Sequence, residues 1–169
     1  MFLELARLQL QRGSTDAAIS TMKELKQEFV GERSVQERIA RTLVEEDEIE
    51  LAWQEYVELA KQTQNSEQKL LYQIESAELQ RQLGETKKAT DEFLRLLRKL
   101  RPDSWLYRNV RDRMEASILA EESLDVLVEF YVKAVQQTPD DLSMRLRLGK
   151  IQLLAGKLVE SRETIEQVI

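Results

Sequence analysis

A large side chain returns at nearly regular intervals along this chain of 169 residues. Met22, Tyr56, Phe93, Tyr131 and Ile165 are separated by 34, 37, 38 and 34 residues. Self-similarity with a period of roughly 20 to 50 residues is the signature of repeat proteins, in which each repeat packs mainly on its neighbours. The spacing therefore predicts five copies of one structural unit, stacked in sequence order.

Each copy has the pattern of two helices joined by a tight turn. In the first copy, Ala6 and Leu10 recur at helical spacing, Gly13 interrupts the pattern, and Ala18 and Met22 continue it in a second helix. Glycine adopts the left-handed backbone that ends many helices. The small side chains of Ala6 and Ala18 allow the two helices to approach closely, and Met22 fills the space beside them.

The later copies repeat this scheme with local departures. Asp47 stands at the turn of the second copy, where the first has a glycine, whereas Gly84 and Gly156 mark the turns of the third and fifth. In the fourth copy, Glu115 and Leu127 replace the two small residues and no glycine marks the turn. We therefore expect the packing of the fourth copy to be looser or shifted.

Taken together, these residues resemble the tetratricopeptide (TPR) repeat. That family pairs a small residue in each of its two helices, places a glycine at the turn and a large residue four places later, and often ends a repeat with proline. The corresponding residues here are Ala6, Ala40, Ala77 and Gly149 in the first helices, Ala18, Ala52, Ala89 and Ser161 in the second, and Pro102 and Pro139 at repeat ends.

The resemblance implies an all-α fold, a right-handed α-solenoid of about five helix-turn-helix repeats. The repeats would cover residues 1–33, 34–66, 67–103, 104–140 and 141–169, in one domain spanning 1–169. A generic helical-hairpin solenoid related to the TPR is the alternative. Because the chain begins inside a helix and ends at Ile169 without a polar closing helix, we expect it to be a fragment of a longer protein, or to make end-to-end contacts between copies.

Composition restricts the possible functions. The chain has no histidine and no cysteine, so it lacks the commonest general base, metal ligand and thiol nucleophile. It contains no glycine-rich phosphate loop and no apolar run long enough to cross a bilayer. With 33% charged residues and a net charge of −6, we expect a soluble cytoplasmic protein that is not an enzyme and has no cofactor or metal.

Two charged segments have alternative interpretations. The acidic stretch Glu45–Glu48, with Glu50, could hold a hard cation, but it lacks the alternating spacing of a calcium loop and is more simply a solvated turn. A basic cluster surrounds Trp105 and Tyr107 and comprises Arg95, Arg98, Lys99, Arg101, Arg108, Arg111 and Arg113. This cluster could contact an anionic peptide or nucleic acid, or it could be a solvated helix face with both aromatic rings buried.

The resemblance also implies a groove lined by the exposed face of the first helices. The candidate partner-binding residues are Leu3, Arg7, Leu10, Glu37, Arg41, Val44, Ile74, Glu78, Arg81, Asp112, Ala116, Leu119, Leu146, Lys150 and Leu153. The TPR proteins that clamp chaperone tails use a lysine and asparagines where this chain has Leu3, Arg7 and Arg41, so a chaperone tail is not the expected ligand.

We therefore predict a protein-interaction scaffold or adaptor that binds a peptide or an amphipathic helix in the concave groove. One alternative is a regulatory or oligomerisation segment of a larger multidomain protein. Another is an RNA-binding helical repeat, which the net negative charge disfavours.

Overall fold

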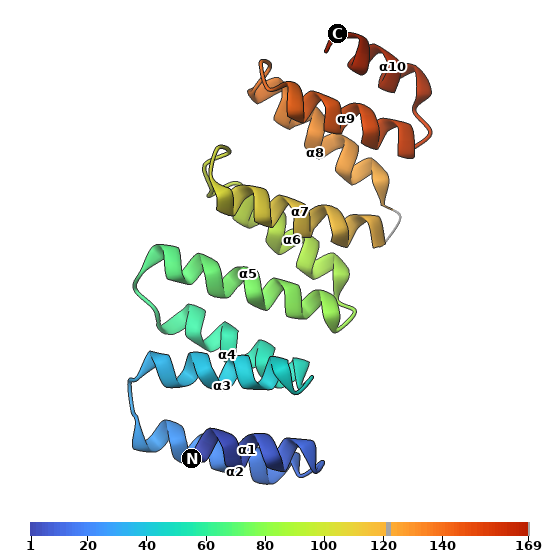
Figure 1. The fold of residues 1–169 in the computed structure, drawn as a ribbon. Coiled ribbons are helices and arrows are strands. Elements are labelled where there is room, and N and C mark those ends of the chain that lie inside the picture. Colours follow the sequence, from blue (N-terminus) through green and yellow to red (C-terminus); the bar gives the residue numbers. More distant parts are fainter. Residues whose placement is uncertain (121–122, 169) are drawn as a thin grey trace. The chain divides into compact units, whose positions relative to one another are not determined.

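The computed structural model describes residues 1–120 and 123–168, and these fold into α-helices (Figure 1). The helices are α1 (Phe2–Gln11), α2 (Thr15–Glu28), α3 (Arg33–Glu45), α4 (Ile49–Gln62), α5 (Ser66–Gln82), α6 (Thr86–Leu97), α7 (Trp105–Ala120), α8 (Leu124–Gln137), α9 (Leu142–Leu154) and α10 (Leu158–Glu166). Consecutive helices pack on each other in an antiparallel manner from α1 to α6 and from α8 to α10. The prediction of an all-α array of about five helix pairs is confirmed.

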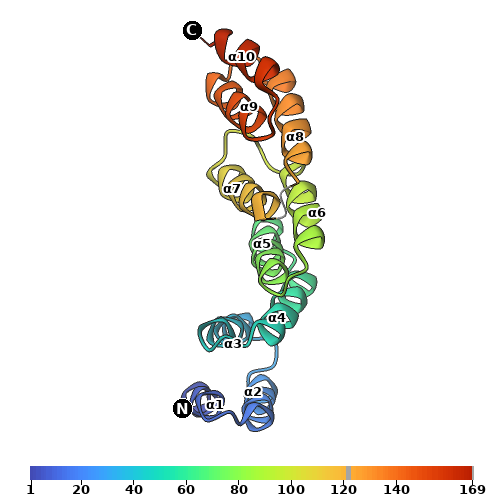
Figure 2. The same cartoon turned by 90° about the vertical axis from the view of Figure 1, so that its right-hand side faces the viewer.

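The chain forms two compact units, which we call the N-terminal unit (Met1–Val110) and the C-terminal unit (Arg111–Ile169). Within the N-terminal unit, α1, α3 and α5 form one layer and α2, α4 and α6 form the other (Figure 2). Within the C-terminal unit, α9 packs on both α8 and α10. We call the first layer of the N-terminal unit the odd-helix layer.

The small residues of the repeat pattern lie at the closest helix contacts. Ala6 and Ala18, like their counterparts in the second and third repeats, are fully buried. In the fifth repeat, Gly149 takes this position because a Cβ atom there would lie 2.6 Å from Cγ1 of Ile165. The Ser161 hydroxyl also donates a hydrogen bond of 2.7 Å to the Gly149 carbonyl. The helix pairs are therefore held together by close backbone approach as well as by apolar burial.

The turns that follow α1, α3, α5 and α9 share one hydrogen-bond pattern. In the first, the amide of Ser14 donates to the carbonyl of Gln9 at 2.8 Å and the amide of Gly13 donates to Leu10 at 2.8 Å. This Schellman motif requires a left-handed residue, and Gly13 has a φ of 72°. Asp47 occupies the same position with a φ of 62°, so an aspartate there carries the backbone strain that glycine avoids.

The fourth repeat departs from the prediction in a specific way. Leu127 is fully buried as expected, but Glu115 does not lie at the close helix contact, and Met114 and Ser117 are buried instead. Glu115 is partly exposed and pairs with Arg147 of α9. A carboxylate between two closely packed helices would be desolvated without a partner, which is costly, so the inward face of α7 is shifted. Residues 121–122, where the sequence predicts the turn of this repeat, lie outside the described part of the chain.

Candidate functional site

The residues predicted to line a groove do not all reach the surface. Leu10 and Ile74 are only 8% and 1% exposed and belong to the core, so they cannot contact a partner directly. The other predicted residues are exposed or half-buried: Leu3, Arg7, Glu37, Arg41, Val44, Glu78 and Arg81 in the N-terminal unit, and Asp112, Ala116, Leu119, Leu146, Lys150 and Leu153 in the C-terminal unit. The two buried residues stabilise the helices that carry the others.

Arg7 connects α1 to α3. Its Nε atom lies 2.6 Å from Oε1 of Glu46, and its Nη2 atom lies 3.9 Å from Oε2 of Glu45. The hydrogen bond to Glu46 raises the pKa of the Arg7 guanidinium. Thr15 of α2 also donates a hydrogen bond to Glu48, at 3.3 Å. The acidic stretch therefore binds the first helix pair to the second, a role that its composition did not reveal.

Glu37 connects α3 to α5. Its carboxylate accepts a hydrogen bond from the Tyr72 hydroxyl and lies 3.5 Å from Nε of Arg33. Burial of the Tyr72 ring, together with the bond to Glu37, raises the pKa of Tyr72 to about 12. The Tyr72 ring also lies 6.3 Å from the ring of Tyr56, between centroids. This cluster fixes the spacing of two neighbouring helices in the odd-helix layer.

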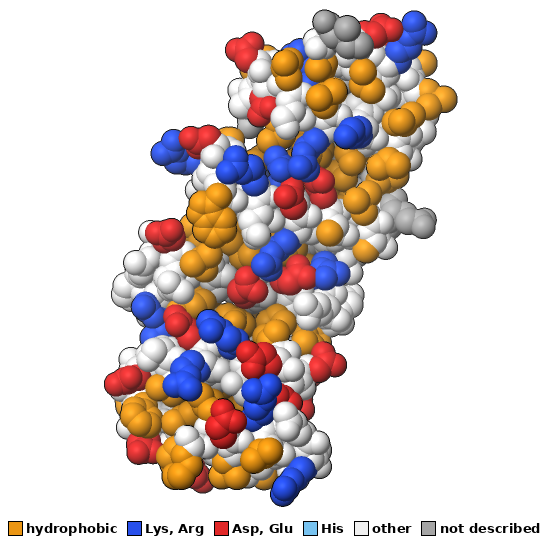
Figure 3. Space-filling model, in the orientation of Figure 1, with side chains coloured by type: hydrophobic (Ala, Val, Ile, Leu, Met, Phe, Trp, Pro, Cys, Tyr) orange, Lys and Arg blue, Asp and Glu red, His pale blue; other side chains and the backbone are white. Residues whose placement is uncertain are grey.

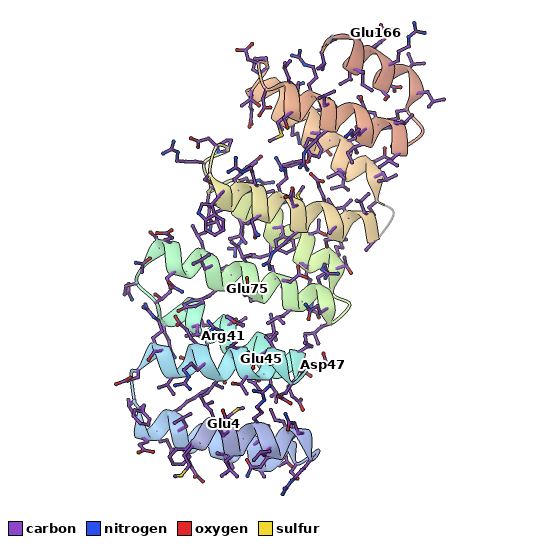
Figure 4. The ribbon with its side chains drawn as sticks, viewed as in Figure 1. Glu4, Arg41, Glu45, Asp47, Glu75 and Glu166 are labelled. Carbon is purple, nitrogen blue, oxygen red and sulfur yellow. The ribbon has the colours of Figure 1, made fainter. Side chains whose placement is uncertain are left out.

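Arg41 is an exposed cation of this layer, and it is available to a partner. Among the described residues no carboxylate forms an ion pair with Arg41, whereas Arg81 is bound to Glu78 at 2.6 Å. Figure 4 shows Arg41 on α3, with Glu75 on α5 above it and Glu4 on α1 below it. Sequence reasoning missed Glu4 and Glu75, although helical spacing places acidic and basic residues together on this face. Figure 3 shows basic, acidic and hydrophobic side chains interspersed on the same face of the N-terminal unit.

A charge network connects α7 and α9 in the C-terminal unit. Nη1 of Arg147 lies 2.8 Å from Glu115 and 3.3 Å from Asp112. The buried Arg111 guanidinium pairs with the same carboxylates, at 3.0 Å to Asp112 and 3.6 Å to Glu115. Burial raises the pKa of Glu115, and the two arginines oppose that shift. Asp112 is therefore held by arginines, whereas Leu146, Lys150 and Leu153 remain exposed on α9.

The basic cluster around Trp105 and Tyr107 is not simply a solvated helix face. Arg111 is buried and ion-paired, Arg95 pairs with Glu92 at 2.5 Å, and Arg101 pairs with Asp103 at 2.8 Å. Tyr107 is buried as that interpretation required, but Trp105 is 61% exposed, so the expectation that both rings are buried is wrong for Trp105. Several of these arginines therefore already have carboxylate partners.

A hollow of 640 Å³ lies where the α2–α3 and α4–α5 connections meet. Its wall includes the apolar Phe29, Val30, Val35 and Leu59, and the charged Lys26, Glu32, Arg33 and Glu58. Lys26 is engaged with Glu55, and Arg33 with Glu37. Its two cations and two anions balance, so this hollow has no charge preference.

The described residues form neither a membrane span nor a metal cluster. No helix among residues 1–120 and 123–168 is both long and apolar enough to cross a membrane. Within the same ranges, no three acidic side chains come together as a metal site would require.

The fold defined by these helix pairs is that of a TPR-like repeat array, and solved structures that cover the whole chain share it. The chain is similar to the nearly identical TPR-like repeats of a putative kinesin light chain from Podosopora anserina, at 18% identity with a TM-score of 0.64, over 99% of this chain and 91% of that one. The resemblance to TPR proteins inferred from the sequence is therefore confirmed at the level of the fold.

Two further structures show the same architecture. MamA from Desulfovibrio magneticus RS-1, from residue 41 to its end, has 15% identity and a TM-score of 0.56, over 99% of this chain and 90% of that one. A tetratricopeptide repeat protein from Parabacteroides merdae has 17% identity and a TM-score of 0.50, over 99% of this chain and 62% of that one. No protein-family model and no curated protein matches the sequence.

Proposed function

We propose that this chain is a protein-interaction scaffold or adaptor, and that the exposed face of the odd-helix layer binds a peptide or an amphipathic helix. The proposal rests on which polar side chains of that face are paired and which are not. Arg7–Glu46 and Glu37–Tyr72 join α1, α3 and α5 into a preorganised layer, and Arg41 remains exposed without a carboxylate partner among the described residues. Preorganisation lowers the entropy cost of binding.

The chemistry of the face favours a partner with mixed character. Arg41 can pair with a carboxylate of the partner, while the exposed Glu4 can pair with one of its cations. Leu3 of α1 and Val44 of α3 offer apolar surface on the same helices. An amphipathic helix or an extended peptide carrying both charge signs fits this pattern.

Selection from a displayed library of random dodecapeptides tests the proposal, with charge-reversal variants as the discriminating step. Arg41→Glu should weaken the binding of selected peptides about tenfold or more, because one attractive charge becomes repulsive. The matched control is Lys23→Glu, since Lys23 is an exposed cation of α2 that has no ion pair among the described residues. Equal loss in both variants, or no loss in Arg41→Glu, would refute the proposal.

A second candidate function is self-association through the α9–α10 turn. Leu158 and Val159 are 64% and 69% exposed, and Leu154 beside them is also exposed. The corresponding positions of the first repeat are the polar Thr15 and Asp16, so packing within a repeat does not require apolar residues there. A Leu158→Glu, Val159→Glu variant should abolish any concentration-dependent dimer in analytical ultracentrifugation. A wild-type chain that is monomeric at high concentration rules this candidate out.

A further inference from the structure

A second hollow lies between α4, α5 and α6 of the N-terminal unit and has a volume of 380 Å³. We propose that it is a separate binding site, for an acidic peptide segment that carries an apolar side chain. The residues that line it are Trp53, Val57, Ala60, Lys61, Lys69, Gln73, Ser76, Gln80, Glu92 and Arg95. We call it the α4–α6 hollow.

The charge of the α4–α6 hollow is opposite to that of the chain. Lys61, Lys69 and Arg95 face a single acid, Glu92, so three positive charges and one negative charge give +2, whereas the whole chain carries −6. A local excess of positive charge in an acidic protein attracts anionic groups to that place. This sign favours anionic ligands, such as the carboxylates of an acidic peptide.

The two lysines are available to such a ligand. Lys69 is exposed and forms no ion pair with any described residue. Lys61 has only Glu58 as a partner, at 3.6 Å, with both side chains largely exposed. An exposed surface pair of this kind contributes little to stability, so Lys61 can exchange its partner at little cost. Arg95 is more firmly engaged, since its guanidinium makes two hydrogen bonds to Glu92.

The wall of the hollow supplies the apolar and polar contacts that a peptide needs. Trp53 is half-buried and, with Val57 and Ala60, offers apolar surface beside the lysines. An aromatic ring gives a large contact area with little loss of side-chain entropy. The side-chain amide of Gln73 has no hydrogen-bond partner among the described residues, and it can both donate to and accept from an extended main chain.

The α4–α6 hollow is distinct from the odd-helix face because α5 presents different sides to the two. A helix turns by about 100° per residue, so Gln73 and Gln80 lie about 40° and 60° to one side of the buried Ala77. Glu78 and Arg81 lie about 100° and 40° to the other side. A ligand in the hollow therefore leaves the odd-helix face accessible.

A peptide fits this site better than a nucleic acid does. Nucleic-acid binding rests on a row of cations that follows several phosphates. The α4–α6 hollow has only two available lysines, in a chain of net charge −6. Two lysines are enough to bind one or two carboxylates of a peptide.

The test uses tryptophan fluorescence. The chain has two tryptophans, so Trp105→Phe leaves Trp53 as a specific reporter of the hollow. Dodecapeptides selected from a random displayed library are titrated into this variant. We expect a class of acidic peptides that change the emission of Trp53 and whose affinity falls with added salt. The double variant Lys61→Gln, Lys69→Gln should weaken them about tenfold.

Matched controls separate this site from the odd-helix face. Lys23→Gln removes an exposed positive charge elsewhere and should leave the affinity unchanged, and so should Arg41→Glu at physiological salt. Replacing Asp and Glu of the peptide by Asn and Gln should abolish binding. The proposal is overturned if acidic peptides are not enriched or if they bind the double lysine variant equally well. If mixed RNA quenches Trp53 fluorescence in the Trp105→Phe protein but not in the double lysine variant, the ligand is not a peptide and the assignment is wrong.

Discussion

Asp47→Gly should stabilise the protein, because Asp47 holds the left-handed position that glycine holds in other turns of the chain. Its φ is 62°, compared with 72° at Gly13 and 82° at Gly84. A left-handed backbone costs an L-residue about 1 to 2 kcal/mol. Aspartate can reduce this cost through local hydrogen bonds, but the Asp47 side chain makes none with the described residues.

Two smaller contributions to the free energy of unfolding oppose the gain in stability from Asp47→Gly. Glycine makes the unfolded chain more flexible, which costs about 0.4 to 1 kcal/mol. Loss of a negative charge near the start of α4 costs about 0.3 kcal/mol. The net expectation is a gain of about 0.5 kcal/mol, or about 1 to 2 °C in Tm for a chain of this length.

The reciprocal substitution Gly84→Ala isolates the backbone effect. A Cβ atom at Gly84 would meet no atom within 4 Å, so only its φ of 82° opposes alanine. We expect a loss of about 1 kcal/mol. Both variants are measured by urea and thermal unfolding followed by circular dichroism, with the m-value as a check that the unfolded state is unchanged. A less stable Asp47→Gly, or a Gly84→Ala as stable as the wild type, would refute the reasoning.

Two further variants test the networks within each unit. Tyr72→Phe should cost about 1 kcal/mol by removing the hydroxyl bonded to Glu37. Because the folded pKa of Tyr72 is about 12, above the ordinary value near 10, wild-type stability should fall as pH rises from about 10 to 12, and this fall should be smaller in Tyr72→Phe. Urea titrations of both proteins across that pH range test this prediction. If stability falls equally with pH in the wild type and in Tyr72→Phe, the pKa of Tyr72 is not raised by folding. Glu115→Ala should cost about 2 to 3 kcal/mol in thermal unfolding, since it removes a partner of the buried Arg111. Glu115→Gln should cost less, and equal losses would show that the charge of Glu115 is unimportant.

The candidate site was only partly predictable. Helical spacing identified Arg41 and Val44 as exposed, and both are. The same reasoning included Leu10 and Ile74, which are buried, because spacing gives the angle around a helix but not how far the neighbouring helix extends over it. It also passed over Lys61 and Lys69, which lie on different helices and line one hollow. Nothing in their sequence spacing shows that α4 and α5 bring them together.

The repeat, the helix pairs and their turns follow from the sequence alone. Ala52, Ala89 and Gly84 could be assigned from spacing because helices and Schellman turns depend on contacts between residues close in the sequence. The pairing of Glu46 with Arg7, and of Glu115 with Arg147 in place of a position in the helix contact, became visible only in the folded structure. Those outcomes depend on the desolvation of charges between helices, and that cost exists only once the helices are packed.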